Sequence, residues 1–160
     1  MSREPLRAAV LAAIEAELAR QTHAALDARD ESISEESRAE NKYDTHAQEA
    51  AYLAEGQARL ATELAAALPA CRPLVFPPPG QAAAQLGSLV TPAAGPRTEY
   101  RLLGPARGGL TVADPADPAR EITVVTPASP LGRALLGRRV GDALPPLRKG
   151  APAPRVTGLG

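Results

Sequence analysis

The sequence predicts an α+β protein in which an N-terminal antiparallel coiled-coil hairpin precedes a small antiparallel β domain with one short helix. Of the 17 prolines, only Pro5 precedes residue 69, and proline is disfavoured inside helices. Apolar residues recur at helical spacing before this boundary and at strand spacing after residue 86. Residues 1–68 hold 7 Lys and Arg against 13 Asp and Glu, whereas residues 69–160 hold 11 against 5. This division indicates two different partner surfaces, or simply the charge that alanine-rich helices need for solubility.

Residues 1–68 are expected to form the hairpin, with helices over 6–28 and 40–68. In the first helix, Leu6, Val10, Ile14 and Leu18 recur every fourth residue, with alanines between them. The apolar seam expected on the second helix consists of Tyr43, Ala47, Ala50, Leu53, Leu60, Leu64 and Leu68. Because these seams are narrow and rich in alanine, the two helices can pack closely as an αα-hairpin.

The tip of the hairpin is expected near residues 29–40, where serines favour a turn. The acidic residues that gather at and beside this tip are Asp27, Asp30, Glu31, Glu35, Glu36 and Glu40. A cluster of carboxylates is a candidate for binding a hard cation such as Mg²⁺, which prefers oxygen ligands. The alternative interpretation is a solvated acidic turn with no chemical role.

Residues 69–85 are expected to be a proline-rich linker, stiffened by polyproline II structure over residues 77–79. Residues 86–160 then form the β domain, whose small size gives it a marginal core. The expected strands are Gly87–Thr91, Glu99–Leu103, Gly109–Val112, Glu121–Thr126, Asp142–Leu144 and Arg155–Leu159.

The most informative segment is residues 129–142, Ser-Pro-Leu-Gly-Arg-Ala-Leu-Leu-Gly-Arg-Arg-Val-Gly-Asp. Ser129 suits the N-cap of a short helix, and Pro130 suits its first helical position, where the missing N–H costs no hydrogen bond. The apolar face of this helix is expected to consist of Leu131, Leu135 and Leu136. Gly137 suits the left-handed residue that ends a helix.

This segment closely resembles the signature of the C-terminal domain of Gre-type transcript cleavage factors. The resemblance follows the serine, proline, leucines and glycines in order and comes directly after a strand. It implies an FKBP-like fold for residues 86–160, and it implies that this domain docks on bacterial RNA polymerase. On this interpretation Arg133, Arg138 and Arg139 form the docking surface; the alternative is that they are a solvated basic face.

The second half of the hairpin also resembles the Gre hairpin, because Glu40 and Asn41 match the Glu-Asn of that family. In the family, a tip aspartate and this glutamate enter the secondary channel of the polymerase and help to hold a second Mg²⁺ at its active site. The aspartate position falls on Ser37, so Glu36 is the candidate second ligand. The resemblance therefore implies catalytic and metal-binding roles for Glu40 and Glu36, and a partner-binding role for Asn41.

The resemblance implies a secondary-channel-binding transcription elongation factor that stimulates cleavage of backtracked RNA. Such a factor is not itself an enzyme: it acts through the polymerase, has no cofactor of its own, shares the polymerase's Mg²⁺ and meets the nascent RNA 3′ end only indirectly. DNA binding and a monomeric state are also expected. Because Ser37 departs from the family pattern, a non-cleaving inhibitor that competes with Gre factors is the alternative.

A peptidyl-prolyl isomerase or chaperone is a more distant alternative, suggested by the FKBP-like fold. An isomerase site needs a ring of aromatic side chains, and aromatics make up only 2% of this chain. The same scarcity argues against nucleic-acid binding by base stacking. The single cysteine, Cys71, fits a reducing cytoplasm. The longest uncharged run, residues 73–96, holds six prolines and is not expected to cross a membrane.

Overall fold

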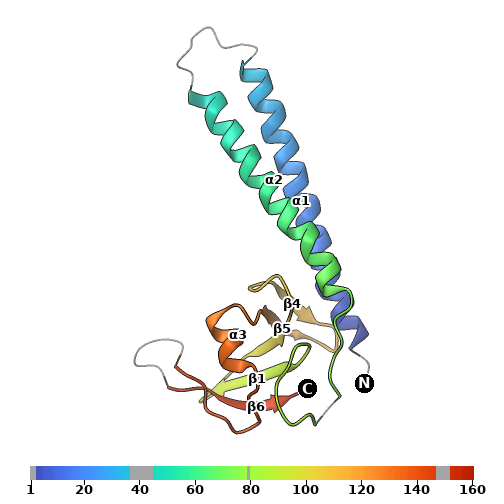
Figure 1. Ribbon diagram of the computed structural model, residues 1–160, viewed down its shortest axis with the longest axis vertical. Helices are drawn as coiled ribbons and strands as arrows, with labels where there is room; N and C mark the ends of the chain where they lie inside the picture. Colours follow the sequence, from blue (N-terminus) through green and yellow to red (C-terminus); the bar gives the residue numbers. More distant parts are fainter. Residues whose placement is uncertain (1–2, 37–44, 79, 147–151) are drawn as a thin grey trace. The chain divides into compact units, whose positions relative to one another are not determined.

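The structure is a computed structural model that describes residues 3–36, 45–78, 80–146 and 152–160. Its elements occur in the order of two long helices, five strands, a short helix and a last strand (Figure 1). The helices are α1 (Glu4–Glu36), α2 (Thr45–Cys71) and α3 (Pro130–Leu135). The strands are β1 (Leu89–Ala94), β2 (Arg97–Thr98), β3 (Tyr100–Leu103), β4 (Thr111–Asp114), β5 (Asp117–Val125) and β6 (Arg155–Leu159). The predicted α+β class is confirmed.

The chain divides into two compact units. One, the helical unit, is Ile14–Leu68, and the other, the β unit, combines Met1–Ala13 with Pro69–Gly160. The predicted boundary assigns residues 1–13 to the hairpin, together with the rest of residues 1–68. Within the β unit, however, Leu6 and Val10 are buried, and a guanidinium nitrogen of Arg7 donates to the carbonyl oxygen of Arg72 at 3.1 Å. These contacts explain why the start of α1 belongs to the β unit.

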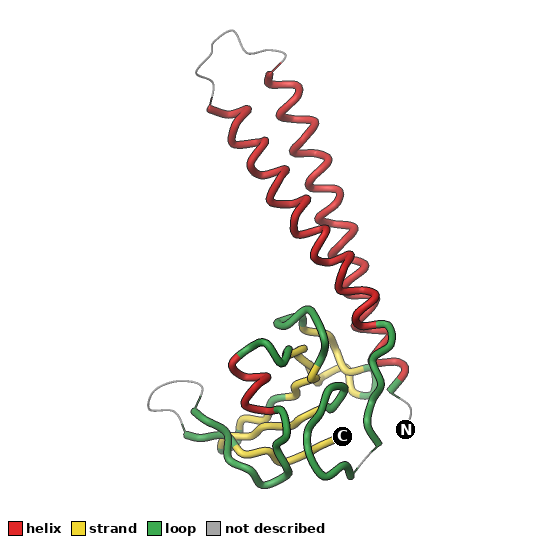
Figure 2. The backbone as a smooth tube through the Cα atoms, viewed as in Figure 1, coloured by secondary structure: helices red, strands yellow, loops and turns green. Residues whose placement is uncertain are grey.

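In the helical unit, α1 and α2 run side by side in opposite directions (Figure 2). Ile14 and Leu64 are fully buried, as the helical spacing predicts. The expected seam is wrong at Leu53, whose side chain is 55% exposed. Among the described residues, no helix is long and apolar enough to span a membrane.

The helix ends differ from the predicted ones. α1 continues to Glu36, so residues 29–36 are helical and the predicted turn is wrong over this range. This stretch contains neither glycine nor proline, and its serines cost a helix only a few tenths of a kcal/mol each. α2 runs to Cys71 and includes Pro69, which lies in its last turn and is followed by the helix end two residues later.

The β unit is built on one mixed sheet with the order β2-β1-β3-β5-β4, and β6 also pairs with β1. Most pairs are antiparallel, but β3 and β5 are parallel, with Leu102 opposite Val124. The prediction of an antiparallel sheet is therefore corrected to a mixed one. Residues 142–144 were expected to form a strand, and instead contribute an isolated bridge between Ala143 and Arg155.

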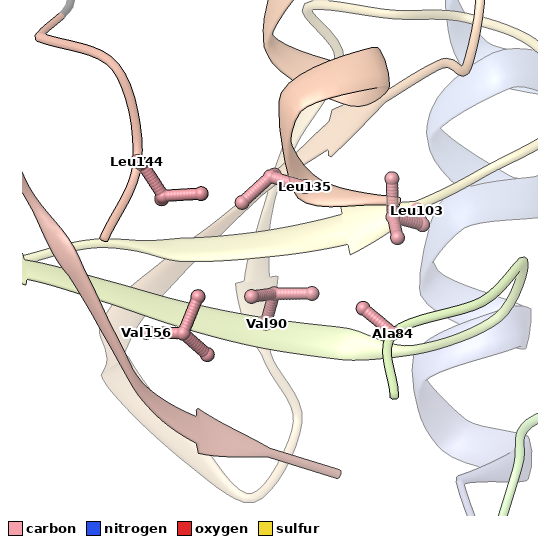
Figure 3. Close-up of a cluster of buried hydrophobic side chains, with 6 residues drawn as sticks. All are labelled: Ala84, Val90, Leu103, Leu135, Leu144 and Val156. Carbon is pink, nitrogen blue, oxygen red and sulfur yellow. The ribbon is translucent and has the colours of Figure 1, made fainter. Parts of the chain in front are cut away.

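Both faces of the sheet are covered, because adjacent residues such as Leu102 and Leu103, or Val124 and Val125, are all buried. The core between the sheet and α3 is a cluster of six buried side chains (Figure 3). These are Ala84, Val90, Leu103, Leu135, Leu144 and Val156. Leu131 and Leu159 pack against this cluster and are partly buried.

The segment that follows α2 is anchored to the β unit and is not a free spacer. Leu74 and Pro77 are buried, and a Cβ atom at Gly87 would lie 2.0 Å from the carbonyl oxygen of Val75. Further along, Ala84 donates its N–H to the carbonyl oxygen of Arg138 and accepts from the N–H of Gly137, each at 2.7 Å. This reciprocal pair fixes the end of α3 against the segment before β1.

Candidate functional site

The start of α3 is held by the cap that the sequence predicts. The hydroxyl of Ser129 accepts from the N–H of Gly132 at 3.0 Å and donates to the carbonyl oxygen of Thr126 at 2.8 Å. Pro130 occupies the first helical position. One hydroxyl therefore satisfies an orphan helix donor and ties the helix to the end of β5.

Two glycines complete this geometry. A Cβ atom at Gly132 would lie 1.9 Å from the carbonyl oxygen of Thr126, so only glycine allows this close approach. Gly137 has a φ of +77°, the left-handed conformation expected at a helix end. The segment 129–137 thus has the local structure that its sequence predicts.

The predicted apolar face of α3 is confirmed at Leu135, which is fully buried, and wrong at Leu136, which is 46% exposed. Leu136 is the C-cap residue, with a φ of −59° and a ψ of 130°, so its backbone has already left the helix. Its side chain consequently departs from the buried face of the helix and faces solvent.

The arginines expected to contact a partner lie within this short helix (Arg133) and just after it (Arg138 and Arg139). A nitrogen of Arg133 donates to the carbonyl oxygen of Ala128 at 2.6 Å, and Nε of Arg138 donates to that of Ala134 at 3.0 Å. Each bond uses one of five guanidinium donors, which leaves the others available to a ligand. Among the described residues, no carboxylate forms an ion pair with Arg133, Arg138 or Arg139.

Two apolar side chains lie beside these arginines in the chain. Leu136 is 46% exposed and Val140 is 59% exposed. The carboxylate of Asp142 is engaged with the backbone N–H of Arg139 at 2.8 Å. We call the set Arg133, Leu136, Arg138, Arg139 and Val140 the α3 surface. It combines cationic and apolar groups that are exposed or partly exposed.

The acidic tip is only partly described. Glu36 is the last residue of α1, and the predicted tip residues Ser37, Glu40 and Asn41 lie outside the described residues. Their catalytic, metal-binding and partner-binding roles therefore remain predictions. Within the described ranges, no three His, Cys, Asp or Glu side chains gather in a way that could hold a metal ion.

One polar cluster was missed by sequence reasoning. Arg120 bonds Asp114 at 3.2 Å and approaches Asp117 at 3.4 Å, and its guanidinium lies 4.5 Å from the centre of the Tyr100 ring. Asp114 also accepts from the N–H of Ala116 at 2.9 Å. The sequence pattern that could have predicted this cluster is Asp-x-x-Asp-x-x-Arg, in which charged residues recur every third position across the β4–β5 turn. These groups satisfy one another, so the cluster holds the turn.

Burial alters the protonation of two groups in the β unit. Burial raises the pKa of the Cys71 thiol, against a weaker opposing effect of a hydrogen bond with the backbone of Ala106. Burial lowers the pKa of Arg3, and the nearby carboxylate of Asp114 partly offsets this. A buried thiol with a raised pKa is a poor nucleophile, which argues against a catalytic role for Cys71.

A groove of about 530 Å³ also opens on the β unit. Its apolar lining includes Leu131, Leu144 and Pro154, and its charged residues are Arg97, Glu99 and Arg101. No aromatic side chain is among the described residues that line the groove. The ring of aromatic side chains expected at an isomerase site of the FKBP type is therefore not found among these residues.

Comparisons with known proteins give structural neighbours only. No protein-family profile and no curated protein sequence matches the chain. A structure of GreA factor homolog 1 (Gfh1) of Thermus thermophilus aligns with 94% of this chain and 94% of its own, at 21% identity and a TM-score of 0.35. A second structure of the transcription factor Gfh1 aligns at 21% identity over 94% and 93% of the two chains, with a TM-score of 0.37.

Thermus aquaticus Gfh1 aligns over 91% of this chain and 90% of its own, at 18% identity and a TM-score of 0.35. At these identities and TM-scores, no functional property passes from the neighbours to this chain.

Proposed function

We propose that this protein is a transcription elongation factor that binds bacterial RNA polymerase and reaches its secondary channel. The observation that carries the proposal is the segment 129–142, whose resemblance to the Gre signature is matched by its local structure. Ser129 caps α3, Gly132 allows the close approach to Thr126, and Gly137 ends the turn in the left-handed conformation. The hairpin of α1 and α2 supplies the second part that such a factor requires.

The α3 surface is proposed as the docking surface. Its arginines carry positive charge that no described carboxylate neutralises, and the exposed Leu136 and Val140 offer apolar area to a partner. Charge complementarity of this kind raises association rates and orients the partners. An acidic polymerase surface with apolar groups fits these properties.

The tip is proposed to act at the polymerase's own active site, so that the chain is an accessory factor rather than an enzyme. The carboxylates of Glu36 and Glu40 are hard oxygen donors and fit Mg²⁺ by their chemistry, whereas the hydroxyl of Ser37 adds no charge. When bound, such an ion lowers the pKa of an attacking water. This chain's contribution is to position one or two carboxylates.

A non-cleaving inhibitor is the second candidate, and the observation that favours it is Ser37. With a hydroxyl at the family's aspartate position, the tip carries one carboxylate fewer toward the ion. Such a factor would still enter the channel and would compete with cleavage factors there. The two candidates share the docking step and differ only in what the tip does.

The test uses purified bacterial core polymerase and the whole chain. Binding is measured directly, and RNA length is then followed in stalled, backtracked elongation complexes. We expect saturable binding that is weakened in the double variant Arg138→Glu, Arg139→Glu. The control is Arg72→Glu, which reverses the charge of one exposed arginine outside the α3 surface and makes half of the double variant's charge change.

Each outcome decides between the candidates. Shortening of the RNA from its 3′ end supports a cleavage factor, and binding with slower elongation but no shortening supports the inhibitor. Absence of binding to the polymerase contradicts both. Equal binding by the double variant and the control removes the docking role of the arginines.

A further inference from the structure

The groove on the β unit has the features of a second binding site, separate from the α3 surface. Its volume of about 530 Å³ lies within the range of about 300–1,000 Å³ that is usual for ligand sites. Part of its lining comes from β1 and β2, part from Leu131 at the start of α3, and part from Leu144, Pro145, Pro152 and Pro154. Several separate chain segments therefore shape one concave surface.

The lining of the groove offers apolar area. Leu131 and Leu144 contribute aliphatic carbon, and Pro92, Pro145 and Pro154 contribute ring carbons without N–H donors. Leu144 belongs to the six-residue core (Figure 3), and Leu131 packs against that core. This part of the groove wall is therefore fixed in position. An aliphatic side chain placed here would be removed from water against a firm apolar wall.

The charged residues of the groove differ in whether they form an ion pair. Arg101 and Glu99 form an ion pair at 2.6 Å, and their side chains are only 18% and 30% exposed, so they largely neutralise each other. Arg97, on the exposed strand β2, forms no ion pair with any described residue. Among the described residues that line the groove, Arg97 is thus the positive charge without a carboxylate partner.

We propose that this groove docks an acidic peptide segment of a protein partner, with one aliphatic side chain against Leu131 and Leu144 and a carboxylate at Arg97. Charge complementarity selects an acidic segment, since Arg97 is the unneutralised charge. The apolar wall selects an aliphatic neighbour. A nucleic acid is disfavoured because the described lining residues include no aromatic side chain on which a base could stack. This site does not depend on the proposed polymerase binding.

The test titrates the isotopically labelled full-length chain with short blocked peptides and follows backbone amide signals by NMR. The probe is acetyl-Gly-Asp-Leu-Asp-Gly-amide, and the comparison peptide has lysines in place of both aspartates. We expect saturable shifts at Ala94, Arg97, Leu131 and Leu144 with the acidic peptide only. A third peptide with glycine in place of leucine should bind more weakly.

Two variants probe the groove and one serves as control. Arg97→Glu should weaken binding about fivefold or more, because it replaces one exposed ion pair with repulsion. Ala94→Leu should weaken it by filling the groove without changing charge. Arg72→Glu makes the same charge change outside the groove and should have no effect. Thermal unfolding of each variant shows whether it remains folded.

Several results would overturn the proposal. These are the absence of saturable shifts, equal binding of the lysine peptide, or equal weakening by Arg97→Glu and Arg72→Glu. A short single-stranded RNA that shifts the same amides when the acidic peptide does not would assign the groove to nucleic acid instead. None of these results bears on polymerase binding through the α3 surface, so the two proposals fail separately.

Discussion

Truncation of Leu135 to alanine should destabilise the β unit far more than the same change at the next residue. Leu135 is fully buried among six core side chains, and Leu136 is 46% exposed. Leu135→Ala removes three carbons, at about 0.8 kcal/mol each, and leaves a cavity, for a total of roughly 2–5 kcal/mol. Leu136→Ala should change the free energy of unfolding by less than about 1 kcal/mol.

Hydrogen exchange of the β1 and β3 amides is the suitable assay, because it reports opening of the β unit without interference from the long helices. Against a total stability of about 5–15 kcal/mol for a typical domain, the loss at Leu135 should appear as a large rise in exchange rate. Similar exchange in Leu135→Ala and Leu136→Ala would refute the assignment of α3's buried face.

Three further predictions follow from the site. Gly132→Ala should unfold or displace α3, since its Cβ would lie 1.9 Å from the carbonyl oxygen of Thr126; near-wild-type thermal stability would contradict this. If the tip positions Mg²⁺, Ser37→Asp should raise cleavage of backtracked RNA and Glu40→Ala should abolish it with polymerase binding unchanged; unaltered RNA lengths in both variants would contradict this. Because burial raises its pKa, the Cys71 thiol should alkylate more slowly at pH 8 in the folded chain than in denaturant; equal rates would contradict this.

Features set by neighbouring residues could be predicted from the sequence. The cap at Ser129 and the left-handed Gly137 depend on contacts within a few residues, and both are confirmed. The long helices were likewise predicted from their spacing, but their ends were not. Residues 29–36 show why: serine and acidic residues suit both a turn and a helix, and nothing local decides between them.

Features that join distant segments could not be predicted. Strand periodicity shows which residues are buried, but it does not show that β3 pairs in parallel with β5. The groove could not be predicted for the same reason, since only the folding of the sheet and of the chain after α3 brings Arg97 and Leu144 to one surface. Helical spacing predicted that Leu136 is buried on the face of α3, but α3 ends at Leu135, and Leu136 already has a non-helical backbone conformation.

The reciprocal hydrogen bonds between Ala84 and the end of α3 make chain length, rather than side-chain identity, the property that this segment must preserve. Both bonds use backbone atoms, so most residue types at position 84 could form them, provided that the small buried space there is respected. A residue inserted between Ala84 and Leu89 would instead move the N–H and carbonyl groups of Ala84 away from their hydrogen-bond partners on Gly137 and Arg138. The turn at Gly95 is exposed, with no heavy atom within 4 Å of a Cβ built there, and an epitope tag could be placed in this turn without this penalty.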